Sequence, residues 1–250
     1  MSDTLNINRS IINKPIVSNY LWFLVMSYSI VIILSNWFAG RLISLSGDFS
    51  TGAGALIFPL AFLLSDIITE VYGYKWARVA VWCGFLFNTI FLVLGQIVIL
   101  LPSPDYAIQS NEMFDSVLQT SGRIVIASIL AYLIAEPVNS YIMAKTKVWF
   151  NGKYMGVRFI LSTTVASFID SNIMGTVAFY GKMPLYELFI FNVTLCFVKV
   201  FIELIITPLS TSFTRRLKDI EGSDIYDIDT NFNIFSFDTK YSEKSNKFKK

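Results

Sequence analysis

The chain has 250 residues, of which 54% are hydrophobic, 16% aromatic and only 15% charged, with a formal net charge of +2. Soluble domains carry about 25% charged residues, so the composition indicates that lipid rather than water surrounds much of the chain. The sequence contains no histidine, which excludes histidine zinc sites and histidine-activated nucleophiles, and its two cysteines lie in separate apolar runs that predict no metal finger.

Six apolar stretches are long enough to cross a bilayer, which takes about 20 residues for roughly 30 Å of hydrocarbon. In chain order they cover residues 21–40, 53–71, 79–101, 124–143, 157–180 and 185–209. Short links join the second stretch to the third and the fifth to the sixth, so these pairs should be antiparallel neighbours. The sequence therefore predicts an all-α integral membrane bundle of six transmembrane helices within residues 21–216.

Basic residues gather at one end of these spans. That end carries Arg9, Lys14, Lys75, Arg78, Lys145, Lys147, Lys153, Arg158, Arg215, Arg216 and Lys218, whereas the other carries Arg41, Arg123 and Lys182. Because Lys and Arg near span ends stay on the cytoplasmic side, we expect both termini to be cytoplasmic. Residues 1–20 then form a cytoplasmic segment, and the polar residues 217–250 a cytoplasmic tail that we expect to be disordered and dispensable.

One regularity concerns Glu70, Glu136 and Glu203, which recur at nearly constant spacing, each late in an even-numbered span. Three helical hairpins in series would give this pattern, and so would six spans of similar length without any repeat.

Apart from Arg158 and Glu187, which stand in the first turn of their spans, six ionisable residues lie inside the predicted spans: Asp66, Glu70, Glu136, Asp170, Lys199 and Glu203. Each costs about 2.5–3.5 kcal/mol near mid-membrane on insertion scales, so we expect them to face a polar interior. Asp66 and Glu70 are four residues apart and share one helix face. Lys199 and Glu203 do the same, so the two pairs can meet. A structural ion network is the alternative, but such a network would need fewer unpaired carboxylates.

Residues 58–78 read FPLAFLLSDIITEVYGYKWAR. This segment resembles the signature of the queuosine precursor transporter family, also called the vitamin uptake transporter family. Residues 136–141 (EPVNSY) and 167–171 (SFIDS) are also similar to the family. The resemblance extends from about residue 21 to residue 216 and leaves out the N-terminal segment and the tail.

The resemblance implies a multi-pass transporter of the bacterial inner membrane rather than an enzyme. Its substrate would be a 7-deazaguanine imported for tRNA modification: 7-cyano-7-deazaguanine, 7-aminomethyl-7-deazaguanine or queuine. We expect no cofactor, no metal and no nucleic acid partner. The lipid bilayer surrounds the chain, and the oligomeric state stays open.

A guanine-like ring presents N1–H and an exocyclic amine side by side, and one carboxylate can accept both hydrogen bonds. The candidate substrate-binding residues are Asp66, Glu70, Glu136 and Asp170 as acceptors, Phe62, Tyr72 and Phe168 for stacking, Asn172 and Asn192 for the ring carbonyl, and Lys199 with Glu203 to set the charge of the site.

Other functions stay open at this point. A substrate-binding subunit that needs a separate energising complex also has about six helices, but it would need a face of small residues on the first span. A membrane aspartyl protease would need Asp66 or Asp170 in a GxGD context, which neither has. Proton coupling through the buried carboxylates and facilitated diffusion are both consistent with the sequence.

Overall fold

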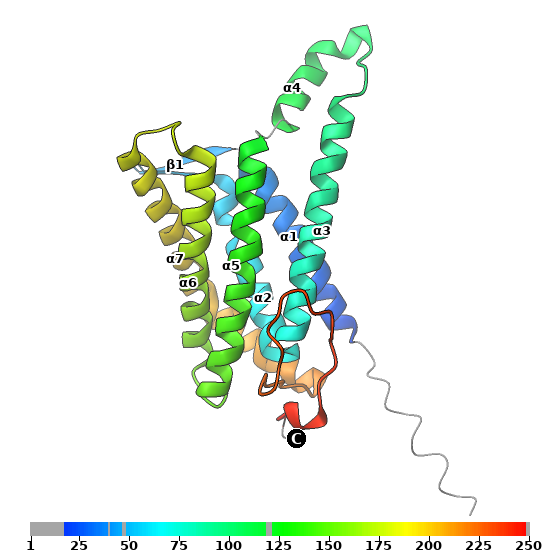
Figure 1. Cartoon of the computed structure of the whole chain (residues 1–250), viewed down its shortest axis with the longest axis vertical. Helices are drawn as coiled ribbons and strands as arrows, with labels where there is room; N and C mark the ends of the chain where they lie inside the picture. Colours follow the sequence, from blue (N-terminus) through cyan, green and yellow to red (C-terminus); the bar gives the residue numbers. More distant parts are fainter. Residues whose placement is uncertain (1–17, 40, 47–48, 119–121, 249–250) are drawn as a thin grey trace, which may run out of the picture.

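The computed structural model describes residues 18–39, 41–46, 49–118 and 122–248 and shows a bundle of long helices (Figure 1). The predicted cytoplasmic residues 1–17 lie outside the described residues. The helices are α1 (Asn19–Ala39), α2 (Pro59–Tyr72), α3 (Tyr74–Ile99), α4 (Ile108–Leu118), α5 (Gly122–Trp149), α6 (Met155–Phe179) and α7 (Leu185–Glu221). Strands β1 (Leu42–Ser46) and β2 (Phe49–Gly52) pair antiparallel between α1 and α2. Short 3-10 turns cover Ala53–Leu56, Asp105–Ala107 and Glu243–Ser245.

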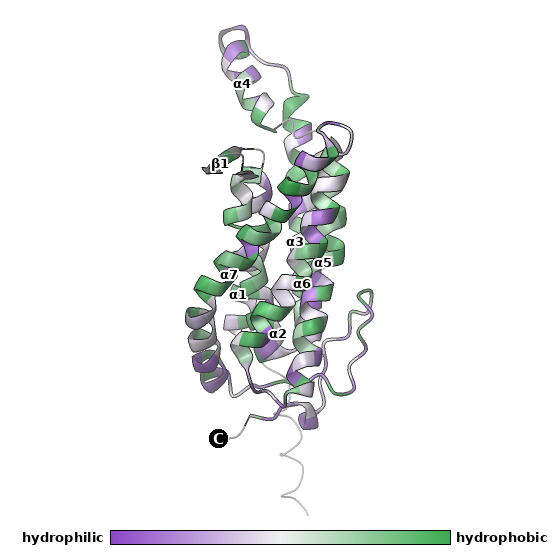
Figure 2. Ribbon diagram, turned by 90° about the vertical axis from the view of Figure 1, so that its left-hand side faces the viewer, coloured by the Kyte–Doolittle hydropathy of each residue, from purple (hydrophilic) through white to green (hydrophobic). Residues whose placement is uncertain are grey.

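Five helical segments are long and apolar enough to cross a membrane: Tyr20–Ala39, Ala53–Tyr72, Tyr74–Ile99, Ile126–Trp149 and Leu185–Glu221. Figure 2 shows hydrophobic residues along much of α1, α3 and α7, and many large apolar side chains of these helices are exposed. On α7, for example, Phe189, Phe197 and Phe201 are all exposed. A bundle that turns such side chains outward and buries charged ones is built for a lipid environment.

The remaining long helix, α6, differs in composition. Its 25 residues correspond to about 37 Å, enough to cross the hydrocarbon layer. It carries Arg158, Asp170 and several serines and threonines, and it packs along both α5 and α7. The structure thus gives an all-α membrane bundle with five apolar spans, and a sixth crossing by α6 stays a prediction.

A proline and a glycine determine where α2 begins and where it ends before α3. Pro59 stands at the first position of α2, where its missing N–H costs nothing. Gly73 ends α2 and precedes α3 with a φ of 85°, a left-handed conformation that favours glycine. The core lies where α1, α2, α3 and α5 meet, and includes Tyr28, Phe62 and Ile68.

The turn Ala53–Leu56 packs tightly against the end of α1 through Gly54. A methyl group at this position would meet the carbonyl oxygen of Ser35 and the backbone of Ala39. We expect Gly54→Ala to lower the free energy of unfolding by about 1–3 kcal/mol, because the two segments must separate. Thermal unfolding in detergent measures this. Gly95→Ala is the control, since a methyl group there makes ordinary contact with Leu118 at 3.6 Å, and equal losses in both variants would contradict the prediction.

The C-terminal residues 222–248 differ from the mobile tail that the sequence suggested. They fold back over the start of α3, where Asp227 accepts a hydrogen bond from the backbone N–H of Tyr74 at 3.0 Å and the Tyr241 hydroxyl accepts one from that of Lys75 at 2.9 Å. Arg78 donates to the carbonyl oxygens of Asn231 and Asn233 at 3.2 and 2.7 Å. The first N–H groups of a helix lack partners within the helix, and the tail supplies them.

The Tyr241 hydroxyl also donates to Asp227 at 2.5 Å. Burial and the nearby charge of Asp227 raise the pKa of Tyr241 well above its ordinary value, so the hydroxyl keeps its proton. We expect Asp227→Ala to remove the acceptor for α3, to cost about 0.5–2 kcal/mol as for a lost helix cap, and to speed tryptic cleavage after Lys240 and Lys244. Asp229→Ala, at an exposed position, is the control, and equal cleavage of both variants would contradict this role of Asp227.

Candidate functional site

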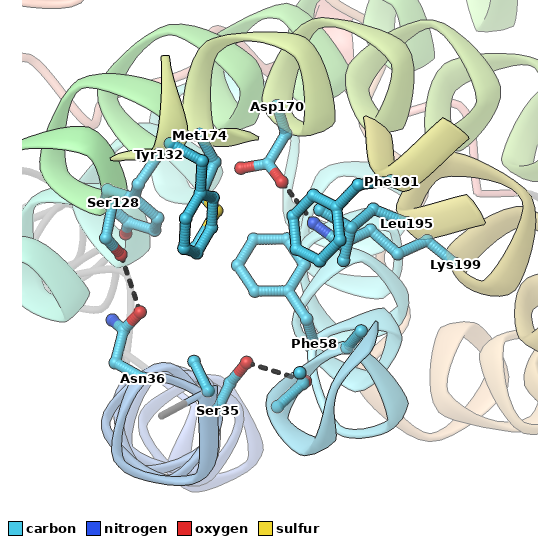
Figure 3. Close-up of a pocket in the computed structure, with 15 residues that line it drawn as sticks. Ser35, Asn36, Phe58, Ser128, Tyr132, Asp170, Met174, Phe191, Leu195 and Lys199 are labelled. Atoms are coloured by element: carbon cyan, nitrogen blue, oxygen red, sulfur yellow. Dashed lines mark hydrogen bonds and ion pairs between the residues drawn. The ribbon is translucent and has the colours of Figure 1, made fainter. Parts of the chain in front are cut away.

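A pocket opens between α1, α5, α6 and α7 at the end of the bundle that carries the β1–β2 hairpin (Figure 3). Its cavity volume is about 70 Å³, which is room for about five water molecules. Its lining consists of Ser35, Asn36, Ala39, Gly52, Gly54, Ala55, Phe58, Ser128, Tyr132, Asp170, Met174, Phe179, Phe191, Leu195 and Lys199.

An ion pair forms one wall of this pocket. The Lys199 ammonium on α7 donates to the Asp170 carboxylate on α6, and both residues are about 95% buried, with exposures of 5% and 4%. The ammonium also lies 4.1 Å from the centroid of the Phe58 ring. Burying two charges costs free energy even when they pair with each other. Because this pair lies at the wall of the pocket, where a ligand could contact it, we infer that it recognises a polar ligand.

The wall facing the ion pair carries neutral polar groups (Figure 3). The Ser128 hydroxyl donates to the amide oxygen of Asn36 at 2.6 Å, and the Asn36 amide nitrogen donates to Asn88 at 3.1 Å. These two hydrogen bonds fix the orientation of the Asn36 amide. The Tyr132 hydroxyl donates to the carbonyl oxygen of Val81 at 2.6 Å, which holds its ring at the pocket edge.

Aromatic and apolar side chains complete the lining. Phe58 and Phe191 lie beside the ion pair, and Tyr132 and Met174 lie on the other side of the pocket (Figure 3). Aromatic faces and a methionine thioether suit a flat, polarisable ring. With a carboxylate, an ammonium and an amide around these faces, the pocket has the groups needed to hold a planar heterocycle by its edges.

The opposite end of the bundle is closed by a cluster of charges around Glu70, which we call the Glu70 hub: Glu70, Lys147, Arg158, Lys218 and Asp224. The Arg158 guanidinium donates to both Glu70 oxygens, at 2.6 and 3.0 Å, and Lys218 donates to one of them at 2.6 Å. Lys147 and Lys218 also pair with Asp224 of the tail at 2.7 and 2.6 Å. The hub seals the end of the bundle and uses both oxygens of Glu70.

Three further carboxylates lie between the pocket and the hub. Asp66 accepts hydrogen bonds from Asn139 at 2.8 Å and from Ser162 at 3.4 Å. Glu136 and Glu203 are fully buried, and their oxygens accept no hydrogen bond of normal geometry from the described residues, although the hydroxyls of Tyr28 and Ser65 lie near Glu136. None of the three lines the pocket.

The other predicted residues lie elsewhere. Phe62 packs edge-on against Phe58, with ring centroids 5.0 Å apart, and Tyr72 stands at the hub end of α2. Phe168 is 62% exposed on the outside of the bundle. Asn172 donates to a carbonyl of its own helix at 2.7 Å. Asn192 donates to Thr176 at 3.4 Å. Of the predicted set, the structure brings only Asp170 and Lys199 into the pocket.

Sequence reasoning missed the wall formed by Ser35, Asn36, Ser128 and Tyr132. A signal was present, since Ser35 and Asn36 form a polar pair inside an otherwise apolar run. Inserting an uncharged polar residue into a membrane costs less free energy than inserting an ionised one. A search for charged residues alone therefore does not find these four.

Comparison with known proteins identifies relatives. Residues 52–213 match the family described as "putative vitamin uptake transporter". A protein of Bacillus subtilis (strain 168) described as "probable queuosine precursor transporter" is 25% identical over 173 residues, which cover 68% of this chain and 74% of that protein. No solved structure matches the chain. The family match includes α2 to α6 and most of α7, but neither α1 nor the folded tail.

Proposed function

The chain belongs to the vitamin uptake transporter family, and on this premise we propose that it imports a queuosine precursor, a 7-deazaguanine, across the bacterial inner membrane. Family membership makes it a multi-pass membrane transporter rather than an enzyme. The substrate belongs to the proposal, and the name of the Bacillus relative supports it.

The observation that carries the proposal is the pocket with the Asp170–Lys199 pair. The Asp170 carboxylate can accept N1–H and the exocyclic amine of a guanine-like ring, and Lys199 or Asn36 can donate to the ring carbonyl. Phe58 and Tyr132 offer aromatic faces to the ring. An acidic interior favours the amine-bearing 7-aminomethyl-7-deazaguanine and queuine over the nitrile.

The arrangement in the membrane is also part of the proposal: α6 crosses as the sixth span, and both termini are cytoplasmic. The start of α1 and the end of α7 lie at the same end of the bundle (Figure 1). That end carries Lys75, Lys147 and Lys218, and positive residues favour the cytoplasmic side. The hairpin end with the pocket then faces outward, so this conformation is open to the outside and closed at the Glu70 hub.

The test is rescue of queuosine-modified tRNA in a bacterial strain that lacks both precursor synthesis and its own transporter, at limiting external precursor. We expect the wild-type chain to rescue and Asp170→Asn to fail at equal membrane abundance. Asp219→Asn, an exposed carboxylate on α7, is the matched control and should rescue. Absence of rescue by the wild type with every deazaguanine would contradict the proposal. If the purified chain still bound the compound, it would instead be a binding subunit that needs an energising complex.

A further inference from the structure

The bundle interior contains more carboxylates than its cations can neutralise. Among the described residues, the hub cations Arg158, Lys147 and Lys218 neutralise Glu70. Lys199 neutralises Asp170. Asp66, Glu136 and Glu203, which we call the buried acid set, have no cationic partner in the part of the chain that the structure describes, and each is 0% exposed.

Asp66 interacts with each of the other two carboxylates. Asp66 on α2 is close enough to Glu203 on α7 and to Glu136 on α5 for their charges to interact. Glu136 in turn lies within electrostatic reach of Asp170 and Lys199 in the pocket. The set therefore leads from the pocket towards the hub, since Glu70 follows Asp66 by one turn of α2.

A second feature surrounds the set, namely buried oxygen atoms without partners. The side-chain oxygens of Glu136 and Glu203, the Asn139 amide oxygen and the hydroxyls of Thr163 and Ser167 have no hydrogen-bond partner among the described residues. Asp170 faces Lys199 between the antiparallel helices α6 and α7, so Ser167 lies one turn further towards the hub, at the level of Glu203. The hydroxyls of Thr163 and Ser167 can donate as well as accept, whereas the five oxygens of Glu136, Glu203 and Asn139 can only accept, so acceptors outnumber donors here.

Protons bound to the carboxylates would supply further donors. A buried carboxylate without a counter-charge takes up a proton rather than remain ionised, and the resulting carboxyl O–H donates to a neighbouring oxygen. Near the set or in the hub and the pocket, the other titratable or charged groups include Tyr28 on α1, Glu70 on α2, Tyr132 and Lys147 on α5, Arg158 and Asp170 on α6, and Lys199 and Lys218 on α7. Glu70 engages the hub cations and Asp170 engages Lys199, so none of these cations forms an ion pair with the set.

We propose that the buried acid set is the proton-binding site of this transporter, and that protons pass through it from outside to cytoplasm together with the imported substrate. The inference rests on the proposed function for the identity of the substrate. Substrate binding at Asp170 and Lys199 changes the charge next to Glu136, which links occupancy of the pocket to protonation of the set.

The experiment uses the full chain in proteoliposomes with radiolabelled 7-aminomethyl-7-deazaguanine. A gradient of about one pH unit, acidic outside, should drive accumulation of up to about tenfold per coupled proton. Glu203→Gln should abolish this accumulation and retain exchange of internal for external substrate, because the amide resembles the protonated acid and cannot release a proton. Glu187→Gln, exposed on the same helix, is the matched control and should accumulate like the wild type.

A second measurement needs no variant. Substrate added to wild-type proteoliposomes should acidify the lumen, as an entrapped pH dye reports. Exchange without gradient-driven accumulation, or accumulation driven by a sodium gradient instead, would overturn the proton site and leave the transport function intact. Absence of both exchange and accumulation in the wild type would overturn the proposed function itself.

Discussion

Replacing Arg158 with alanine is expected to destabilise the folded protein by about 3 kcal/mol, the lower end of the cost of breaking a buried ion pair, because Lys218 and Lys147 remain beside Glu70. Arg158 is fully buried and donates to both oxygens of Glu70. The variant should unfold at lower temperature in detergent and accumulate less in membranes. Arg216→Ala, exposed on α7, is the control and should behave like the wild type.

A double variant measures how much the contact between Glu70 and Arg158 itself contributes to stability. Glu70→Gln combined with Arg158→Gln should be less destabilising than the sum of the two single changes, because the double variant leaves neither member of the pair charged. Additive losses would show that the Glu70–Arg158 contact does not stabilise the bundle, and the closure of the cytoplasmic end would then need another explanation.

Loss of either charge in the pocket should have the largest effect on transport. Removing one partner of a buried, hydrogen-bonded charge pair at a binding site costs about 2–5 kcal/mol, or roughly 30-fold or more in apparent affinity. We therefore expect Asp170→Asn and Lys199→Gln each to reduce uptake by at least this factor, measured as initial rates at limiting substrate.

The double variant Asp170→Asn with Lys199→Gln distinguishes recognition from folding. It leaves no uncompensated charge, so its unfolding temperature should lie close to that of the wild type, whereas its uptake should stay lost. Wild-type uptake in the double variant would mean that the pair is only structural and that the substrate binds elsewhere.

Much of the architecture follows from hydropathy. Apolar runs of bilayer length are visible in the sequence, and five of the corresponding helices have the length and composition of membrane spans. The helix bounds were less accurate. Helix α7 continues to Glu221 rather than ending near residue 209, because its polar last turns leave the apolar zone yet keep their helical hydrogen bonds.

The burial of the ionisable residues was also predictable, but their pairing was not. Spacing places Asp66 with Glu70 on one helix face, and Lys199 with Glu203 on another. It does not say which helices meet. The structure pairs Lys199 with Asp170, and Glu70 with cations from α5, α6 and α7. The order of α5, α6 and α7 around α2 decides these partners, and no local pattern encodes it.

The folded tail shows a similar limit. Its polar composition is typical of a mobile segment, since it offers few apolar groups for a core. The structure instead anchors it through hydrogen bonds to the start of α3, from Asp227, Tyr241 and main-chain carbonyls. These partners are residues 74–78, more than a hundred residues away in sequence.

Uptake by the purified protein tests the central claim most directly. Proteoliposomes containing only this chain should take up radiolabelled 7-aminomethyl-7-deazaguanine in a saturable manner, and excess unlabelled 7-deazaguanine should compete, while Asp170→Asn proteoliposomes should match empty liposomes. Uptake by the wild type no faster than leakage into empty liposomes, with protein that is folded and correctly inserted, would contradict the claim that this chain carries the compound across a bilayer by itself.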